Sequence, residues 1–99
     1  MMTVQYLYSE TVTVQRALTP EQTLEIVRMA TRYDSEIQFR KYFFQGEAPL
    51  GGLTREANGK SVLGMLSLNL AKGDRVEIMT YGTDGDVALR TMVDFLQET

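Results

Sequence analysis

Three stretches of the chain alternate between apolar and polar residues, which is the pattern of a half-buried β-strand. They run from Thr3 to Val14, from Glu36 to Phe44 and from Asp74 to Tyr81. The first stretch is long and leaves room for a bend near Ser9-Glu10. The side chains that the alternation places on one face are Val4, Tyr6, Tyr8, Val12 and Val14 in the first stretch, Ile37, Phe39 and Phe43 in the second, and Val76, Ile78 and Thr80 in the third.

A helix is predicted shortly after the first strand. Thr19 is a favoured N-cap residue, and Pro20 suits the first helical position. Glu21 suits the first turn, and Gln22 completes a capping box. The helix should run from Pro20 to about Arg32. Its apolar stripe consists of Leu24, Ile26, Val27, Ala30 and Tyr33.

Two further helices are predicted in the second half of the chain. Ser61 can cap a short helix that ends near Leu66, although Gly64 within it lowers its helix propensity. After the third strand, Thr83 or Asp84 can cap a last helix. The apolar positions of this last helix are Val87, Ala88, Met92, Phe95 and Leu96.

The segment from Gln45 to Ala57 has no sustained apolar period and contains three glycines and a proline, so we expect a loop there. A short strand is allowed near Asn58. This order of elements fits one α+β domain, in which helices cover one face of a largely antiparallel sheet. We see no internal repeat and no second domain over residues 1–99.

Composition narrows the functional classes. The chain has neither histidine nor cysteine, which removes the usual zinc ligands and makes a nucleophile–base pair improbable. We therefore expect no enzyme, no catalytic residues, no cofactor and no metal site. The net charge of −3 argues against nucleic-acid binding. No apolar run approaches the ~20 residues of a membrane-spanning helix, and no signal peptide is visible, so we expect a cytoplasmic protein away from the membrane.

Three segments together resemble one known family. The segment from Asn58 to Leu68, with Gly-Lys-Ser before an apolar run, resembles the regulatory-serine region of HPr. HPr is the histidine-containing phosphocarrier of the sugar phosphotransferase system. Ala30 to Ile37 resembles the end of its first helix, and Gly73 to Tyr81 with the helix that follows resembles its closing strand and helix. The resemblance implies an α+β open-faced β-sandwich of order β-α-β-β-α-β-α, with an antiparallel four-stranded sheet and helices on one face.

The chain departs from this family where the phosphoryl group is carried. An ungapped alignment places Thr19 where the family has its phosphoacceptor histidine, Glu21 where it has an arginine, and Gln22 where it has a proline. An alternative alignment places Gln15-Arg16 at the site, and Gln15 then resembles the glutamine of Crh, a regulatory relative of HPr that also lacks the histidine. We prefer the ungapped alignment, because the helix cap at Thr19 falls where the family's helix begins. Either alignment implies that phosphocarrier activity is lost.

A second departure is the stretch between Phe39 and Ser61, which is longer than in ordinary members of the family. It carries Tyr42, Phe43 and Phe44, which could form a partner-binding edge or a strand exchanged between chains. Aromatic residues in strands also commonly serve as ordinary cross-strand packing. The extra residues at about 45–57 remain part of a single domain in either case.

Ser61 is the leading functional residue. The resemblance implies that it is the serine phosphorylated by HPr kinase, with ATP or pyrophosphate as the donor. Its other interpretation is a plain N-cap, and the two are compatible. Val62, Leu63 and Leu66 match the apolar residues with which HPr docks its partners, but they could equally be core residues.

Two functions of different classes follow. In the first, the protein is a regulatory, Crh-like relative of HPr that binds protein partners under the control of Ser61. Those partners would be HPr kinase and a transcriptional regulator. In the second, it is an interaction or scaffold module without phosphorylation, which uses the longer loop as its contact surface. A monomer and a homodimer both remain open.

Overall fold

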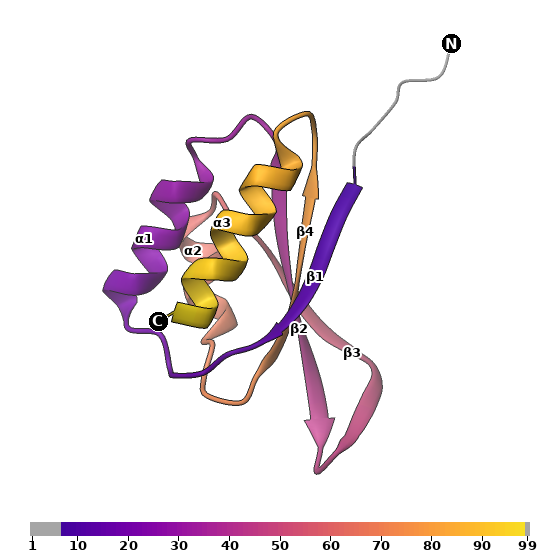
Figure 1. The fold of residues 1–99 in the computed structure, drawn as a ribbon. Coiled ribbons are helices and arrows are strands. Elements are labelled where there is room, and N and C mark those ends of the chain that lie inside the picture. The colour runs from indigo at the N-terminus through magenta and orange to yellow at the C-terminus, as the bar shows by residue number, and fades with distance from the viewer. Residues whose placement is uncertain (1–6, 99) are drawn as a thin grey trace.

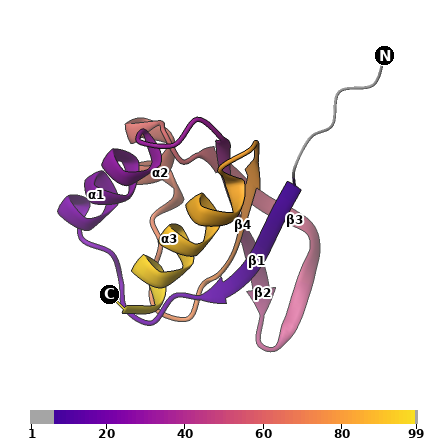
Figure 2. The ribbon, with the colours of Figure 1, turned by 45° about the horizontal axis from the view of Figure 1, so that its top comes forward.

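The computed structural model describes residues 7–98 and confirms the expected order of elements. Their bounds are β1 (Leu7–Thr13), α1 (Pro20–Ala30), β2 (Glu36–Gln45), β3 (Ala48–Asn58), α2 (Val62–Leu68), β4 (Arg75–Tyr81) and α3 (Gly85–Glu98). The four strands form one sheet in the order β1-β4-β2-β3, and every neighbouring pair is antiparallel. The helices lie as a layer on one face of this sheet, and the other face is open (Figures 1 and 2).

The first strand is confirmed over its described part. Residues 3–6, and with them the expected inward side chains Val4 and Tyr6, lie outside the described residues. β1 pairs with β4 from Leu7 to Thr13 without a shift of register, so pairing continues through Ser9 and Glu10, where we left room for a bend.

The core lies between the sheet and the helix layer. Alternation correctly assigned the inward faces of β2 and β4, because Ile37, Phe39, Val76 and Ile78 are all fully buried. Two predicted positions, Leu24 on α1 and Phe43 on β2, are half-buried and lie outside the core cluster. A third was wrong: Val87 on α3 is 55% exposed. It precedes Ala88 by one residue and therefore points about 100° around the helix from the buried stripe. The buried stripe of α3 consists of Ala88, Met92, Val93 and Leu96.

The expected loop over 45–57 is wrong. β3 occupies Ala48–Asn58 and pairs with β2 as a long hairpin, with an irregularity of the register between Tyr42 and Phe44. The hairpin extends beyond the helix layer (Figure 1), and residues 51–56 are exposed. A strand with both faces in solvent shows no apolar alternation, which is why the local pattern did not reveal it.

A carboxylate joins two turns at one end of the sheet. Asp84 directly precedes α3 and accepts hydrogen bonds from the backbone N–H groups of Asp34 and Ser35, both at 2.9 Å, and from the Ser35 hydroxyl. These donors, the Ser35 hydroxyl first, hold the pKa of Asp84 below its ordinary value of 3.8. Asp84 thus fixes the α1–β2 turn to the β4–α3 turn.

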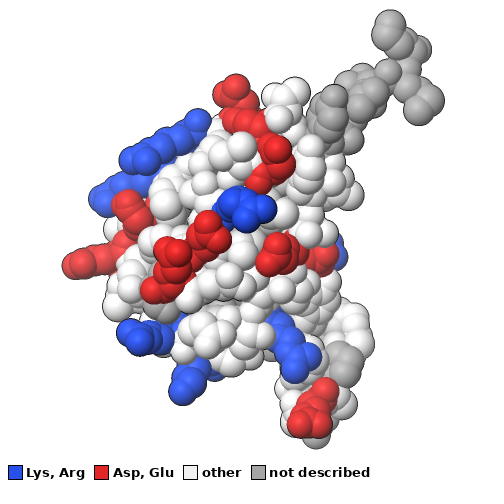
Figure 3. All heavy atoms as spheres, in the orientation of Figure 1, with Lys and Arg blue, Asp and Glu red and all other residues white. Residues whose placement is uncertain are grey.

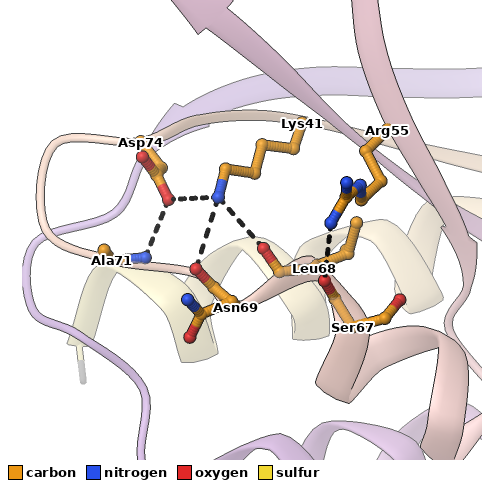
Figure 4. A network of polar contacts seen from close by, with 7 residues as sticks. All are labelled: Lys41, Arg55, Ser67, Leu68, Asn69, Ala71 and Asp74. Atoms are coloured by element: carbon orange, nitrogen blue, oxygen red, sulfur yellow. Dashed lines mark hydrogen bonds and ion pairs between the residues drawn. The ribbon is translucent and has the colours of Figure 1, made fainter.

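Two cations from the hairpin hold the C-terminal end of α2 (Figure 4). The Lys41 ammonium lies 3.0 Å from the carbonyl oxygen of Leu68, 3.3 Å from that of Asn69 and 3.0 Å from an Asp74 carboxylate oxygen. Arg55 donates to the carbonyl oxygen of Ser67 at 3.3 Å. The last carbonyl groups of a helix lack partners within the helix and carry partial negative charge, so cations stabilise them.

Replacing Asp84 with alanine is expected to lower the free energy of unfolding at neutral pH. A carboxylate whose pKa is lowered in the folded state stabilises that state fully above its unfolded-state pKa, here 3.8. The contribution is lost as the pH falls through the lower pKa of the folded state. Urea midpoints of wild type and Asp84→Ala, followed by circular dichroism, should therefore differ at neutral pH and converge in acid. Asp94→Ala, an exposed site on α3, is the control, and equal midpoints at neutral pH would contradict the expectation.

Replacing Lys41 with methionine should destabilise the protein by about 2 kcal/mol. The Lys41 side chain is only 12% exposed. Removal of its ammonium group leaves two carbonyl groups and the Asp74 carboxylate short of a donor. Urea unfolding measures the change. Lys72→Met, at an exposed lysine in the nearby turn, should change stability little, and an equal loss in both variants would show that the network does not matter.

Candidate functional site

Ser61 is the N-cap residue of α2. Its backbone is extended, with φ −103° and ψ 116°, and its hydroxyl accepts a hydrogen bond from the N–H of Gly64 at 3.1 Å. Its carbonyl oxygen accepts from the N–H of Met65, which begins the helical pattern. The side chain is half-buried. The N-cap role expected of Ser61 is therefore confirmed.

Neighbouring side chains leave no room for a larger residue at Gly59 or Gly64, the two glycines near Ser61. A Cβ at Gly64 would lie 3.1 Å from the Ser61 hydroxyl oxygen and 3.4 Å from the Cβ of Ala57 on β3. A Cβ at Gly59 would lie 2.9 Å from the Cγ2 of Ile37 and 3.0 Å from the ring of Phe39. Because nothing larger fits without movement, these glycines let the start of α2 sit directly on the buried face of the sheet.

Lys60 anchors the start of α2 to the end of α1. Its ammonium donates to the carbonyl oxygen of Tyr33 at 2.6 Å, and its own N–H donates to the Asn58 side chain at 2.8 Å. Asn58 also accepts, through its backbone carbonyl, the N–H of Ser61 at 2.9 Å. Contacts made by the residues just before Ser61 therefore hold Ser61 in its position.

The structure divides the apolar residues of α2 into two groups. Met65 and Leu68 are 2% and 1% exposed and belong to the core. Val62 and Leu66 are each 40% exposed and Leu63 is 81% exposed. The sequence left open whether these three residues belong to the surface or to the core, and their exposure places them on the surface. We call them the α2 patch.

Thr19 sits at the N-terminus of α1 and is already engaged. Its hydroxyl accepts the N–H of Gln22 at 3.1 Å, and its own N–H donates to the Gln22 side chain at 2.9 Å, which is the predicted capping box. Glu21 is exposed in the first turn and adds a negative charge there. Gln15, the residue of the alternative alignment, is exposed and donates to the carbonyl oxygen of Thr13.

Ser61 and Thr19 lie at opposite ends of α2. The start of α2 is tied to the end of α1 by Lys60, whereas Leu18, before α1, donates its N–H to the carbonyl oxygen of Leu70, just after α2. The two helices therefore run antiparallel, and the seven residues of α2 span about 10 Å between the two positions. The α2 patch lies between them.

Lys41 and Arg55, which brace the other end of α2, were missed from the sequence (Figure 4). Only one feature of the sequence pointed to this role. Lys41 has the same parity on its strand as the buried residues Ile37 and Phe39, and an inward-facing lysine requires an acceptor.

The described residues contain no group of three or more acidic side chains placed to hold a metal ion. Within residues 7–98, no helix is long and apolar enough to cross a membrane. On the face seen in Figure 3, acidic and basic side chains alternate over α1 and α3 without a continuous basic stripe.

Solved structures of HPr and Crh are among those similar to this chain. The phosphocarrier protein HPr from Bacillus anthracis is 26% identical, with a TM-score of 0.74 over 92% of this chain and 98% of that one. HPr-C-His from Thermoanaerobacter tengcongensis is 20% identical, with a TM-score of 0.72 over 92% of each chain. Crh from Bacillus subtilis, a catabolite repression protein that forms a swapped, intertwined dimer, is 24% identical, with a TM-score of 0.62 over 88% of this chain and 87% of that one.

The two likenesses below 25% identity concern the fold, and all three agree with the open-faced sandwich described above. A family model described as the PTS HPr component phosphorylation site matches residues 8–98. That range spans nearly all of the described chain, from β1 to the end of α3. The chain therefore belongs to the PTS-HPr family.

Proposed function

We propose that the protein is a regulatory member of the PTS-HPr family that does not carry phosphoryl groups and acts by binding proteins through α2. One observation supports this most: α2 presents three exposed apolar residues beside a serine N-cap, whereas the chain has no histidine at all. The helix proposed for docking, α2, is present, whereas histidine, the residue type that the phosphoryl relay needs, is missing.

The N-terminus of α1 supports the loss of carrier activity. Phosphoryl carriage requires a free nucleophile and an environment that accepts negative charge. The Thr19 hydroxyl is used in the capping box, and the neighbouring Glu21 carboxylate would repel a phosphoryl group. The same repulsion argues against a second role for this position as an anion site.

Ser61 supports regulation at the α2 patch. Phosphorylation would transfer the γ-phosphoryl of ATP to the Ser61 oxygen, with release of ADP and loss of the hydroxyl proton. It would add about −1.5 to −2 charge next to Val62 and Leu63. Charge at the rim of an apolar surface disfavours partners that cover the rim with apolar or acidic groups and favours those that offer arginine or lysine. We propose HPr kinase and a transcriptional regulator as the partners.

The alternative is an interaction module without phosphorylation that uses the long β2–β3 hairpin as its contact surface. Leu53 on this hairpin is 56% exposed, which favours some contact there. The two functions differ in whether Ser61 is modified at all.

Incubation with HPr kinase and ATP is expected to add one phosphate, at Ser61. Intact-mass analysis with peptide mapping measures it. Ser61→Ala should remove the label while lowering stability by only about 1 kcal/mol, the cost of a lost N-cap. Ser67→Ala, at an exposed serine of the same helix, is the matched control and should label fully.

Incubation with enzyme I and phosphoenolpyruvate should leave the mass unchanged. A label from this mixture would contradict the loss of carrier activity. If the kinase fails to label the folded wild type, or labels Ser61→Ala to the same extent, regulation at Ser61 is refuted and the interaction module becomes the better description.

Replacing Leu63 with lysine should weaken docking to HPr kinase about tenfold, equivalent to about 1.4 kcal/mol, since it puts a charge in the centre of the α2 patch. Because Leu63 is 81% exposed, the change should leave stability nearly unaltered. The apparent KM of the labelling reaction reports docking. Val87→Lys, at the exposed apolar site on α3, is the control, and equal effects in the two variants would remove the patch from the docking surface.

A further inference from the structure

The long hairpin leaves β3 as an uncovered edge of the sheet. β3 pairs with β2 on one side only, and its register from Thr54 to Asn58 is regular. Every second residue of such a strand directs its N–H and C=O groups away from the sheet. These groups can pair with a further strand.

The same edge carries both an apolar projection and an apolar hollow. Phe43, Leu53, Thr54 and Arg55 line an open pocket of about 310 Å³. Leu53 itself is 56% exposed at this pocket. Arg55 is tethered to the end of α2 through Ser67, so the pocket lies on the side of the sheet that bears the helices. The projection belongs to β3, and the hollow lies between β3 and Phe43 of the neighbouring strand β2.

A surface with a projection and a matching hollow is suited to a two-fold contact, in which one patch meets the same patch of a second copy. We propose that two copies of this chain pair antiparallel through β3, which joins their sheets into one of eight strands. Leu53 of each copy enters the pocket of the other. This inference is independent of the proposed regulation at Ser61.

Charge selects the register. Arg55 and Glu56 are adjacent on β3, and a two-fold axis beside either of them would place like charges directly opposite each other, which is unfavourable. An axis beside Leu53 would put Gly52, whose φ of +79° departs from strand geometry, next to the axis. An axis beside Thr54 avoids these conflicts, and it places Leu53 opposite Arg55 of the second copy.

The shape of the molecule permits this arrangement. The hairpin extends past the helix layer (Figure 1), so in this register the extension of one copy lies along the body of the other. The opposite edge of the sheet is less suitable. The groove beside β1 is lined by Glu10, Asp86 and Asp94 with Arg90 as its one cation, so a two-fold contact there would bring carboxylates together.

Sedimentation equilibrium of the unphosphorylated protein tests the proposal. The wild type should associate to a dimer with a Kd on the order of 10–100 μM, as expected for a small interface. Leu53→Lys should raise the Kd at least about tenfold, because it places a charge on the paired edge. Leu63→Lys, at the strongly exposed leucine of α2, should leave the Kd unchanged. A wild type that is monomeric up to about 1 mM, or a Leu53→Lys variant that dimerises as the wild type does, overturns the proposal.

Cysteine cross-linking provides a second test that does not depend on the stability of Leu53→Lys. The chain has no cysteine, so a single one forms disulfides only between copies. Residues directly opposite in antiparallel strands have Cα atoms about 4.5–5.5 Å apart, within the range of a disulfide. Thr54→Cys should therefore form a covalent dimer on mild oxidation. Thr11→Cys, exposed on the opposite edge strand, should not, and cross-linking of Thr11→Cys equal to or greater than that of Thr54→Cys overturns the proposal.

Discussion

The burial of Ile37 and Phe39 on β2 is the constraint on which the rest of the structure depends. β2 is paired on both sides, with β4 and with β3, and these two side chains are fully buried beneath the helix layer. Gly59 lies against both of them so closely that it cannot carry a side chain without movement. That contact brings the chain down onto the sheet just before α2 and sets the position of Ser61. α2 is thus placed from the core outward.

The two helix caps at Ser61 and Thr19 differ in their surroundings. At Ser61 the hydroxyl caps a helix, but it remains half-buried at the edge of an exposed apolar surface. At Thr19 the hydroxyl and the backbone N–H are both engaged with Gln22, and Glu21 adds a charge of the wrong sign for a phosphoryl group. Both residues therefore cap a helix, but an exposed apolar surface lies beside Ser61 and a carboxylate lies beside Thr19.

The extended β2–β3 hairpin has a structural role in addition to its exposed surface. Lys41 and Arg55 bring its positive charge to the terminal carbonyl groups of α2, so the helix that carries the α2 patch is held at both ends, by Lys60 at its start and by the hairpin at its finish. A contact made by the hairpin and a contact made by α2 would therefore involve neighbouring, rigidly connected surfaces. The pocket between Phe43 and Arg55 adjoins this brace.

The sequence by itself determined the order of the elements apart from β3, the helix caps at Thr19 and Ser61 and the buried faces of β2 and β4, because capping and alternation are local properties. The family followed from local motifs, and the lack of histidine required no structure. Tertiary structure decided the rest. Ala48–Asn58 pairs as β3 because β2 offers a partner, although residues 51–56 of the strand stay exposed and show no apolar alternation. The exposure of Val62, Leu63 and Leu66 and the partners of Lys41 and Asp84 depend on which segments, distant in the chain, meet in the fold.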